Sequence, residues 1–425
     1  MTSHRLPIYI FVAMVTGIVV GAAVHYAYGP ETAVAVGGYL SILSDIFLRL
    51  IKMIIAPLVF ATLVGGIAGM GDGSAVGRVG MKAMSWFVVA SIVSLLLGLV
   101  MANLTLPGKG MNLPLPTADA VTSLKTSSLN LRDFIAHVFP KSIVEAMAGN
   151  EILQIVVFSL FFGIALGRLK DGIGQPLLQS VEGLGQVMLK LTGAVMMFAP
   201  AGVFGAVSAV IATQGLSVLL VYGKLLGSVY LSLAILWVLM IGAGYAFLGR
   251  RVFALLREIR EPLLLGFATA SSESAYPKVM AQLTRFGIRD RIVSFVLPLG
   301  YSFNLDGSIM YTSFAALFVA QVYGIELSLA QQVTMLLVLL VTSKGIAGVP
   351  RASLVVVAAV LPMFGLPEAG ILLVLGIDHV LDMARTATNV LGNALATAVV
   401  AHSEGALDTH ADASAVAGAR HVGYR

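Results

Sequence analysis

The residues best suited to chemistry form a polar stripe near the C-terminus of this 425-residue chain. The stripe contains Asp378, Asp382, Arg385, Asn389 and Asn393, whose spacings of 4, 3, 4 and 4 residues place them on one face of a helix. A guanidinium group pairs with a carboxylate through two parallel hydrogen bonds, and Asp382, one turn from Arg385, suits a cation. The stripe therefore predicts a binding site for a zwitterion with an additional carboxylate. The alternative is an Asp–Arg set that is paired internally and only holds helices together.

A second polar group is the stretch TASSESAYPK, Thr269 to Lys278, in a chain that is 58% hydrophobic and only 11% charged. Three serines and Glu273 interrupt the apolar sequence here, and Ser271 and Ser272 are candidates for binding a ligand. The alternative for these serines is helix capping, because Ser is common at helix N-termini.

A third group is the stretch NLDGS, from Asn304 to Ser308. Its glycine permits an unwound turn, and its Asn and Asp oxygens suit a cation or a hydroxyl group. The same pattern also occurs in ordinary turns. The stretch SKGIAGVP, residues 343–350, offers flexible glycines and backbone amides that suit a gate, with a plain loop as the alternative.

These groups must be positioned by apolar segments, since several runs approach the about 20 residues needed to cross a bilayer. Two such runs begin at Ile8 and Trp86, and the mean hydropathy of the chain is +0.95. These features predict an all-α polytopic membrane protein without a separate soluble domain, and the first run is interpreted as a retained span. The chain has no cysteine, which excludes disulfides, thiolate catalysis and cysteine-ligated metals.

Lys and Arg lie in the connectors between apolar runs, in a pattern that indicates orientation. The formal net charge of +5 is interpreted in this way and not as a sign of nucleic-acid binding. The alternation of basic and uncharged connectors predicts six spans within residues 1–250, with both ends of this unit cytoplasmic. The segment 251–287 has basic clusters at both ends and two arms too short to cross separately, so it is predicted to be a re-entrant hairpin.

A second re-entrant hairpin is predicted for residues 328–364, entering from the opposite side. The alternative is two full spans with Lys344 and Arg351 in a cytoplasmic loop. Each hairpin precedes a long apolar segment that polar residues interrupt, at 291–323 and at 366–402. The unit occurs twice with opposite orientation, and inverted repeats with broken helices predict a binding site near the membrane midplane.

Together, the stripe, the hairpins and the NLDGS break resemble the dicarboxylate/amino acid:cation symporter family, which includes the glutamate transporters, up to about residue 402. The resemblance implies eight transmembrane helices plus two re-entrant hairpins, the glutamate-transporter-homologue fold. It implies scaffold and trimerisation spans in residues 1–250, of which the third and sixth contact a transport core in residues 251–402 that moves like an elevator. It also implies a homotrimer among the lipids of the bacterial inner membrane, with both termini cytoplasmic and a disordered tail at 403–425.

The resemblance further implies a substrate site around both hairpin tips, the NLDGS break and the polar stripe. Its residues are Ser271, Ser272, Ser308, Val349, Asp382, Arg385, Thr386 and Asn389. Arg385 would bind the side-chain carboxylate of the substrate, Asp382 its amino group and Asn389 its main-chain carboxylate. Family members that resemble C4-dicarboxylate carriers lack the acid at the position of Asp382. Its presence predicts L-glutamate or L-aspartate as the substrate, with C4-dicarboxylates as the alternative.

The coupling ion is predicted to be a proton, with sodium as the alternative, and neither a cofactor nor a resident metal is expected. The resemblance implies residual cation-site positions at Gly300, Asn304, Asp306, Asn389 and Asn393. Sodium-coupled members carry Asp at the position of Asn393, and Tyr and Thr oxygens where Phe87 and Ala90 align here, so this chain lacks several oxygen ligands. The first candidate for carrying the proton is Glu273, followed by Asp306 and Asp378.

Two other classes of protein fit the sequence less well. An intramembrane serine hydrolase would need a base near Ser271 or Ser272, such as Lys278 or His379, yet no nucleophile motif surrounds the serines. A channel is the other alternative, but two gate-like hairpins around one charged site favour alternating access over an open pore. The chain is therefore predicted to be a symporter and not an enzyme.

Overall fold

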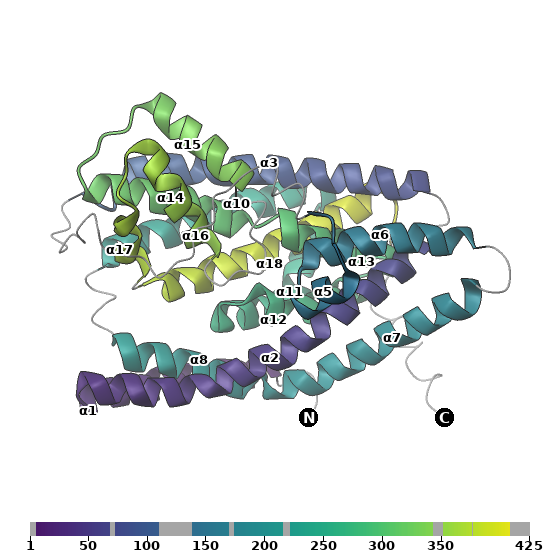
Figure 1. Ribbon diagram of the computed structural model, residues 1–425, viewed down its shortest axis with the longest axis horizontal. Coiled ribbons are helices and arrows are strands. Elements are labelled where there is room, and N and C mark those ends of the chain that lie inside the picture. Colours follow the sequence, from purple (N-terminus) through teal and green to yellow (C-terminus); the bar gives the residue numbers. More distant parts are fainter. Residues whose placement is uncertain are drawn as a thin grey trace.

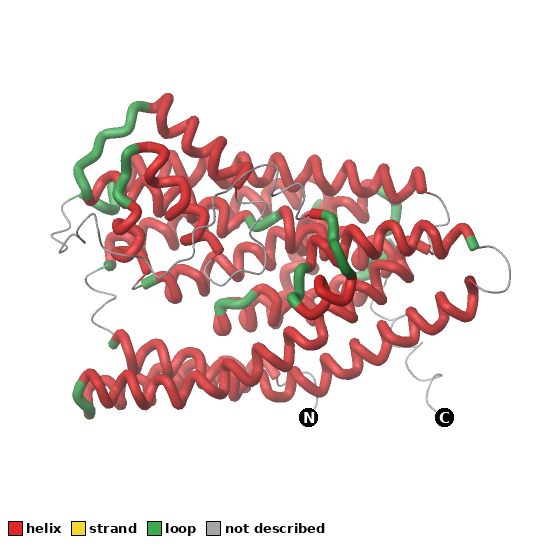
Figure 2. The backbone as a smooth tube through the Cα atoms, viewed as in Figure 1, coloured by secondary structure: helices red, strands yellow, loops and turns green. Residues whose placement is uncertain are grey.

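The structure is a computed structural model, and it describes residues 6–68, 73–109, 138–169, 174–215, 222–342, 352–375 and 377–408. Within these ranges the backbone is helical apart from short connectors (Figures 1 and 2), and the only strand-like pairing is a single bridge between Ile288 and Leu407. The prediction of an all-α fold is confirmed for this part of the chain.

The N-terminal half of the chain supplies most of the long apolar helices. They are α1 (Leu6–Ala27), α2 (Pro30–Ala68), α3 (Gly73–Thr105), α6 (Ile152–Arg168), α7 (Gly174–Val195), α8 (Ala199–Gln214) and α10 (Gly223–Leu248). A 3₁₀ turn at Met196–Phe198 joins α7 to α8, and the short helix α5 (Ile143–Ala148) precedes α6. Among the described residues, six helical segments are long and apolar enough to cross a membrane, five of them in this half and the sixth at Asp290–Val322.

These helices expose large apolar side chains, as helices in a bilayer do. Val89 on α3 is 61% exposed, Phe161 on α6 is 63% exposed and Val238 on α10 is 70% exposed. In water such contiguous apolar surface would be unfavourable, whereas lipid tails are as apolar as the side chains themselves. The exposed faces therefore agree with the predicted membrane location.

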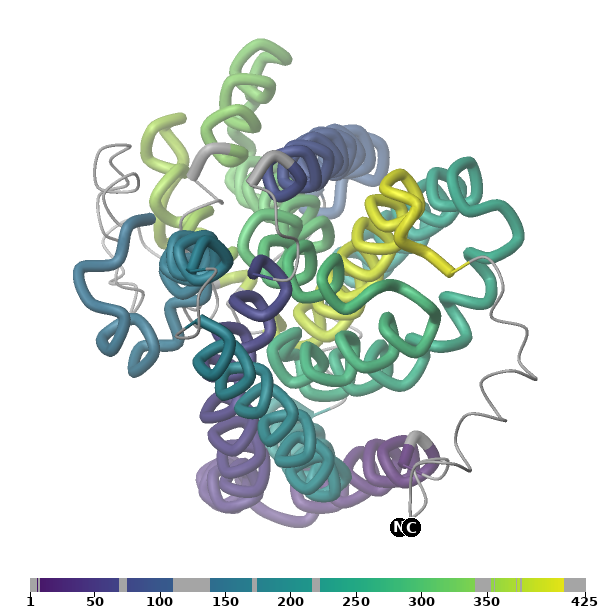
Figure 3. The backbone as a smooth tube through the Cα atoms, turned by 90° about the vertical axis from the view of Figure 1, so that its right-hand side faces the viewer, coloured from purple at the N-terminus to yellow at the C-terminus, as the bar shows by residue number. Residues whose placement is uncertain are grey.

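The last helix, α18 (Asp378–Ser403), lies deep among the other helices (Figure 3). Every residue from Ala384 to Ala401 is buried, although this range contains most of the polar stripe. The helix packs against α10 and against three helices of the C-terminal half, which are α11 (Arg251–Thr269), α13 (Asp290–Phe303) and α14 (Asp306–Val322). Protein therefore shields the polar side chains of α18 from lipid, as intramembrane charges require.

The segment predicted as the first hairpin forms two helices that pack on each other, α11 and α12 (Ser272–Arg285). The turn between them holds Ala270 in the left-handed region at φ 49°, and Ser271 caps α12 by accepting a hydrogen bond from the Ser274 backbone N–H at 3.4 Å. The next apolar segment is interrupted at Asn304 and Leu305, which separate α13 from α14. The helix break predicted from NLDGS is therefore present.

The arms of the second predicted hairpin are α15 (Leu329–Thr342) and α16 (Ala352–Val360), which pack against each other. Its tip, with Val349 and Arg351, lies outside the described residues. After α16, two 3₁₀ turns and the short helix α17 (Ile371–Leu375) lead to α18. The predicted last segment, 366–402, is therefore interrupted shortly before Asp378.

The helices form two neighbouring groups (Figure 1). Helices α1, α2 and α8 lie side by side, and α6 and α7 pack against α2. The other group contains α11 to α14 and α18, with α3 against α14 and α10 against α18, while α2 also contacts α12 and α13. The division at residue 250 into a scaffold and a transport core remains a prediction.

The residues that follow α18 are ordered against the rest of the molecule. The backbone N–H of Arg289 donates to the Ala406 carbonyl at 3.1 Å, and the N–H of Asp408 donates to the Gly287 carbonyl at 3.0 Å. These bonds and the bridge at Leu407 tie residues 406–408 to the base of the first hairpin. The prediction of a disordered tail from residue 403 onward is therefore wrong for residues 404–408, because paired backbone groups hold them in place.

Candidate functional site

Arg385 is the centre of the polar stripe on α18. Its side chain is 3% exposed, and its Nε donates to Asp382 Oδ1 at 2.7 Å while its Nη1 donates to Asp378 Oδ1 at 3.2 Å. The guanidinium carbon lies 4.6 Å from the centre of the Tyr311 ring, whose hydroxyl donates to Asp378 Oδ1 at 3.1 Å. Two carboxylates and an aromatic face therefore compensate the buried cation.

The two acids differ in their access to the outside. The Asp378 side chain is 2% exposed and the Asp382 side chain is 24% exposed. Asp382 Oδ1 also accepts a hydrogen bond from the Thr386 hydroxyl at 3.1 Å. Asp378 therefore belongs to the fixed surroundings of Arg385, whereas an arriving ligand can reach Asp382 directly.

A cavity of about 420 Å³ opens beside Asp382. On one side it is lined by Asp382 and His379 of α18 and by Thr269 and Ala270 of the first hairpin turn. On the other side are residues of α2 and α8, including Asp45. This volume lies within the range of small-molecule sites, and its polar wall suits a charged ligand.

Asn389 connects the stripe to the broken helix. Its Oδ1 accepts hydrogen bonds from the backbone N–H groups of Gly307 at 2.9 Å and Ser308 at 3.2 Å, and its Nδ2 donates to the Ser308 hydroxyl at 2.9 Å. The amides at the start of α14 lack helical partners, and the Asn389 side chain supplies one. The structure therefore brings Ser308 and Asn389 together, as predicted for a shared site.

The predicted cation-site positions form a second cluster beside the first. Asn304 Nδ2 donates to Asp306 Oδ2 at 3.0 Å and to Asn393 Oδ1 at 3.4 Å, and these three residues are at most 1% exposed. Gly300 permits this approach, because a Cβ atom there would collide with Asn393 Oδ1. Within the described residues, no group of three or more His, Asp or Glu side chains is arranged to hold a metal ion.

The serines of the first hairpin tip mainly build the turn. The Ser274 hydroxyl donates to the Ser271 carbonyl at 2.7 Å and lies 2.8 Å from the Thr269 hydroxyl. Ser271 and Ser272 are half-buried next to the turn that lines the cavity. Capping therefore accounts for Ser271, whereas the structure brings neither serine into the lining of the cavity.

Glu273 pairs with a residue outside the Arg385 group. The Glu273 carboxylate, which is 30% exposed, is 3.8 Å from the ammonium group of Lys52 on α2. Lys278, one of the bases considered for a hydrolase, is 2.9 Å from Glu261 instead of lying beside the serines.

Sequence analysis identified most members of the Arg385 group but missed two contacts. Tyr311 follows the NLDGS break by three residues in a mostly apolar helix, and its contact with Arg385 arises from the packing of α14 on α18 and not from a signal in the sequence. Lys52 carried no signal, because its partner is more than two hundred residues away. Val349 lies outside the described residues.

The model of the sodium:dicarboxylate symporter family matches residues 6–403 of the chain. The proton/glutamate-aspartate symporter of Escherichia coli (strain K12) is 41% identical over 406 residues, which cover 94% of this chain and 93% of the relative. The C4-dicarboxylate transport protein of Pseudomonas savastanoi pv. phaseolicola is 42% identical over 414 residues, covering 95% and 88% of the two chains. The proton/sodium-glutamate symport protein of Bacillus caldotenax is 39% identical over 401 residues, covering 93% and 94%. The chain is therefore a membrane transporter and not an enzyme, and it belongs to the sodium:dicarboxylate symporter family.

Proposed function

We propose that this protein is a secondary active symporter that imports L-glutamate or L-aspartate together with protons. The observation that carries the substrate assignment is the pairing of buried Arg385 with the accessible acid Asp382 beside a polar cavity. A substrate carboxylate that enters the cavity takes the place of Asp382 on the guanidinium. Asp382 is then available for the amino group of the same molecule, while Ser308, Thr386 and Asn389 supply hydrogen-bonding groups nearby.

C4-dicarboxylates are the alternative substrates, because relatives named for their transport are as similar to this chain as those named for glutamate. A dicarboxylate without an amino group would leave Asp382 facing a second anion. The extra negative charge at this position therefore favours the amino acids.

The proposed coupling ion is the proton, and its first proposed carrier is Glu273. This carboxylate is partly exposed and has one cationic neighbour, Lys52, on the other group of helices. It can therefore exchange a proton with water and change partner when the helices move. The surroundings of the Asn304, Asp306 and Asn393 cluster support proton over sodium coupling. Phe87 is buried there beside Gly300, and its ring offers no oxygen ligand for a sodium ion.

The proposed mechanism is elevator-type alternating access. Residues 251–402 would form the moving core, carried by a homotrimeric scaffold from residues 1–250, with eight spans, two re-entrant hairpins and both termini on the cytoplasmic side of the inner membrane. Support comes from the two interrupted helices that meet at the site and from the two neighbouring groups of helices.

The test is uptake of labelled L-glutamate into liposomes that contain the purified protein. An inward proton gradient without sodium should drive accumulation, which L-aspartate should inhibit more strongly than succinate. Accumulation that requires a sodium gradient would overturn proton coupling and leave the substrate assignment intact. Succinate accumulation that exceeds glutamate accumulation would overturn the substrate assignment. The Asp382→Ser variant should lose glutamate uptake and keep or gain succinate uptake.

A further inference from the structure

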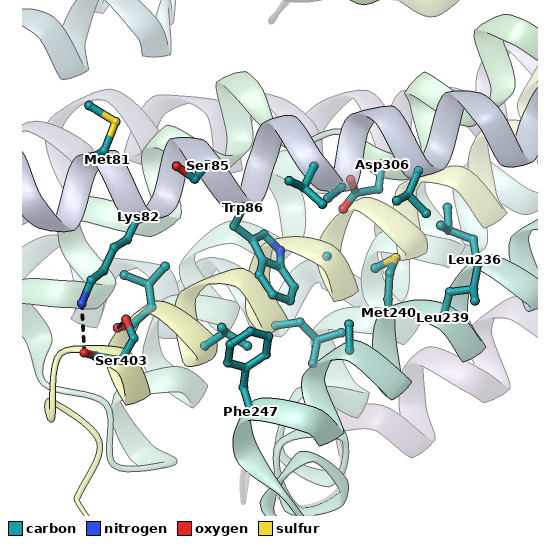
Figure 4. A pocket seen from close by; sticks show the side chains of 18 residues that line it. Met81, Lys82, Ser85, Trp86, Leu236, Leu239, Met240, Phe247, Asp306 and Ser403 are labelled. Carbon is teal, nitrogen blue, oxygen red and sulfur yellow. Dashed lines mark hydrogen bonds between the residues drawn. The ribbon is translucent and has the colours of Figure 1, made fainter.

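A second cavity, separate from the one beside Asp382, lies between α3, α10 and α18 (Figure 4). Its volume is about 730 Å³. We call it the α3–α10 crevice, and its lining side chains are almost all apolar. Those that carry the argument below are Lys82, Trp86, Val93, Ala243, Phe247 and Asp306.

The rim of the crevice lies on the outer surface of α3 and α10, and its side chains are not covered by another part of the described chain. Val89 is 61% exposed, Leu239 is 47% exposed and Phe247 is 51% exposed. Both α3 and α10 are long and apolar enough to cross a membrane, so these rim side chains would meet lipid tails. A hydrocarbon chain is therefore the natural occupant of the space between them.

The two ends of the crevice carry opposite charge. Lys82 lies at one end, where its ammonium donates to the Ser403 carbonyl at 3.0 Å (Figure 4), and Arg78 is one turn away on α3. The two cations share one carboxylate, Glu404, so this end keeps excess positive charge. Asp306 lies at the other end. An amphiphile with an anionic head is therefore oriented in one direction, with its head at Lys82.

The length of the crevice fits one leaflet of a bilayer. Lys82 and Val93 both line it, and eleven residues of helix at about 1.5 Å each span about 16 Å. Half of a hydrocarbon core of about 30 Å is about 15 Å. A chain anchored at Lys82 would therefore reach from the membrane surface to the depth of Asp306.

We propose that the α3–α10 crevice binds one acyl chain of an anionic phospholipid, with the headgroup phosphate at Lys82 and Arg78. The chain packs against the edge-to-face pair of Trp86 and Phe247, whose ring centres are 5.8 Å apart. Its far end covers Asp306 and keeps water away from the cluster with Asn304. Bound lipid would in this way be part of the environment of the predicted cation-site residues.

The first test uses the two tryptophans of the chain, which differ in their surroundings. Trp86 lines the crevice, whereas the indole N–H of Trp237 donates to the Thr388 hydroxyl at 2.8 Å. Phosphatidylglycerol with brominated acyl chains is added to the delipidated full chain in detergent. It should quench Trp86 saturably in the Trp237→Phe variant, and quench Trp237 much less in the Trp86→Phe variant. Equal quenching of both tryptophans would overturn the proposal.

The headgroup is tested by comparing phosphatidylglycerol with phosphatidylcholine of the same brominated chains. A basic residue near the headgroup contributes about 1 kcal/mol, which corresponds to about a fivefold change in affinity. Lys82→Gln should therefore weaken phosphatidylglycerol binding about fivefold and leave phosphatidylcholine binding nearly unchanged. Lys190→Gln, at an exposed lysine of α7, is the matched control and should change neither. No preference between the two lipids in the unmodified protein would exclude the proposed headgroup site.

The acyl-chain site is tested by filling the crevice. Ala243→Phe places a ring inside it, and native mass spectrometry should show loss of the retained lipid. Ala234→Phe is the control, because nine residues of helix place Ala234 on the opposite, exposed face of α10. Equal lipid retention in both variants contradicts the proposal. A change in oligomeric state of Ala243→Phe without loss of lipid would mean that the crevice is an interface between copies, and would also overturn it.

Discussion

At the scale of single residues, Arg385 is held by two acids of different accessibility. Asp378 is buried with Tyr311 and fixes one side of the guanidinium, while Asp382 reaches the cavity. In the proposed binding mode, Asp382 occupies the place on the guanidinium that a substrate carboxylate would take. The internal pairing considered as an alternative to binding is compatible with that proposal, because the Arg385–Asp382 bond would be broken when the substrate arrives.

Arg385→Lys should impair uptake severely, because an ammonium group cannot keep the planar contacts to two carboxylates and the Tyr311 ring. Loss of one partner in a buried charge pair costs at least about 2 kcal/mol, which predicts a KM for glutamate raised by about 30-fold or more. Initial uptake rates in liposomes give this value. Arg257→Lys, at an exposed position of α11, is the control and should match the unmodified protein. An unchanged KM in Arg385→Lys would contradict the assigned role.

Glu273→Gln should abolish uptake driven by a proton gradient, because the amide cannot carry a proton across. Exchange of labelled for unlabelled substrate should continue, since the Arg385 group is not altered. Glu326→Gln, at an exposed acid of the loop before α15, is the control. Full proton-driven uptake by Glu273→Gln would move the role to Asp306 or Asp378.

At the scale of elements, the start of α14 lies against α18 without room for a side chain. A Cβ atom on Gly307 would be 2.8 Å from Thr388 Cβ and 2.9 Å from Arg385 Cα. This close approach lets the Gly307 and Ser308 amides reach the Asn389 side chain. The break in the helix is therefore built around one glycine.

Gly307→Ala should lower the free energy of unfolding by about 1–3 kcal/mol, as overpacking does, and should reduce glutamate affinity because Ser308 moves away from Asn389. Thermal unfolding in detergent and uptake kinetics measure the two effects. Gly227→Ala, in the open on α10, should be neutral or slightly stabilising. Unchanged melting and uptake in Gly307→Ala would show that α14 can shift freely from α18.

The end of α18 is attached to α3 by charge. Arg78 Nη2 donates to Glu404 at 3.0 Å. Hydrogen bonds from Arg78, and to a smaller extent those from Lys82, hold the pKa of the Glu404 carboxyl below its ordinary value of 4.5. The ionised form is stabilised by folding, so this contribution is present above pH 4.5 and is lost as pH falls through the lower folded pKa.

Glu404→Gln should therefore lower the melting temperature at pH 7 by roughly 1–2 °C, because both cations are partly exposed and the pair contributes less than about 1 kcal/mol. The difference from the unmodified protein should shrink as the pH falls below 4.5. A difference that stays constant down to pH 3 would mean that Glu404 acts through packing and not through its charge.

The sequence predicted those elements whose signals are local. The helical spacing of the stripe predicted one face of α18, and the glycine in NLDGS predicted the break before α14. It could not predict that Tyr311 would face Arg385, because this depends on how α14 packs on α18. The Lys52–Glu273 contact and the α3–α10 crevice likewise arise from packing between segments far apart in the sequence.

At the scale of the whole molecule, the Lys52–Glu273 pair connects the two groups of helices. Lys52 is 45% exposed and the two charged groups are 3.8 Å apart, so the pair is weak and can separate readily. If the core moves against the scaffold as proposed, this contact is broken in every transport cycle.

A covalent link at this point should therefore stop transport. The chain has no cysteine, so Lys52→Cys with Glu273→Cys gives a unique pair for a short bifunctional thiol reagent. Cross-linking should reduce counterflow exchange to background, and reduction of a cleavable reagent should restore it. Each single variant treated in the same way is the control. Full exchange by the cross-linked protein would contradict movement of α12 relative to α2.

The backbone bonds between residues 287–289 and 406–408 also have a consequence for biogenesis. The first partner is synthesised more than a hundred residues before the second, and at about 5–20 residues per second it waits roughly 6–24 s. During this time the base of the first hairpin has no bridge partner, and α18 does not yet exist to cover α11 and α14. The interior of the transporter is therefore completed last, and a ribosome that stalls before residue 400 leaves an insertion intermediate whose polar faces are open to lipid and to quality-control proteases.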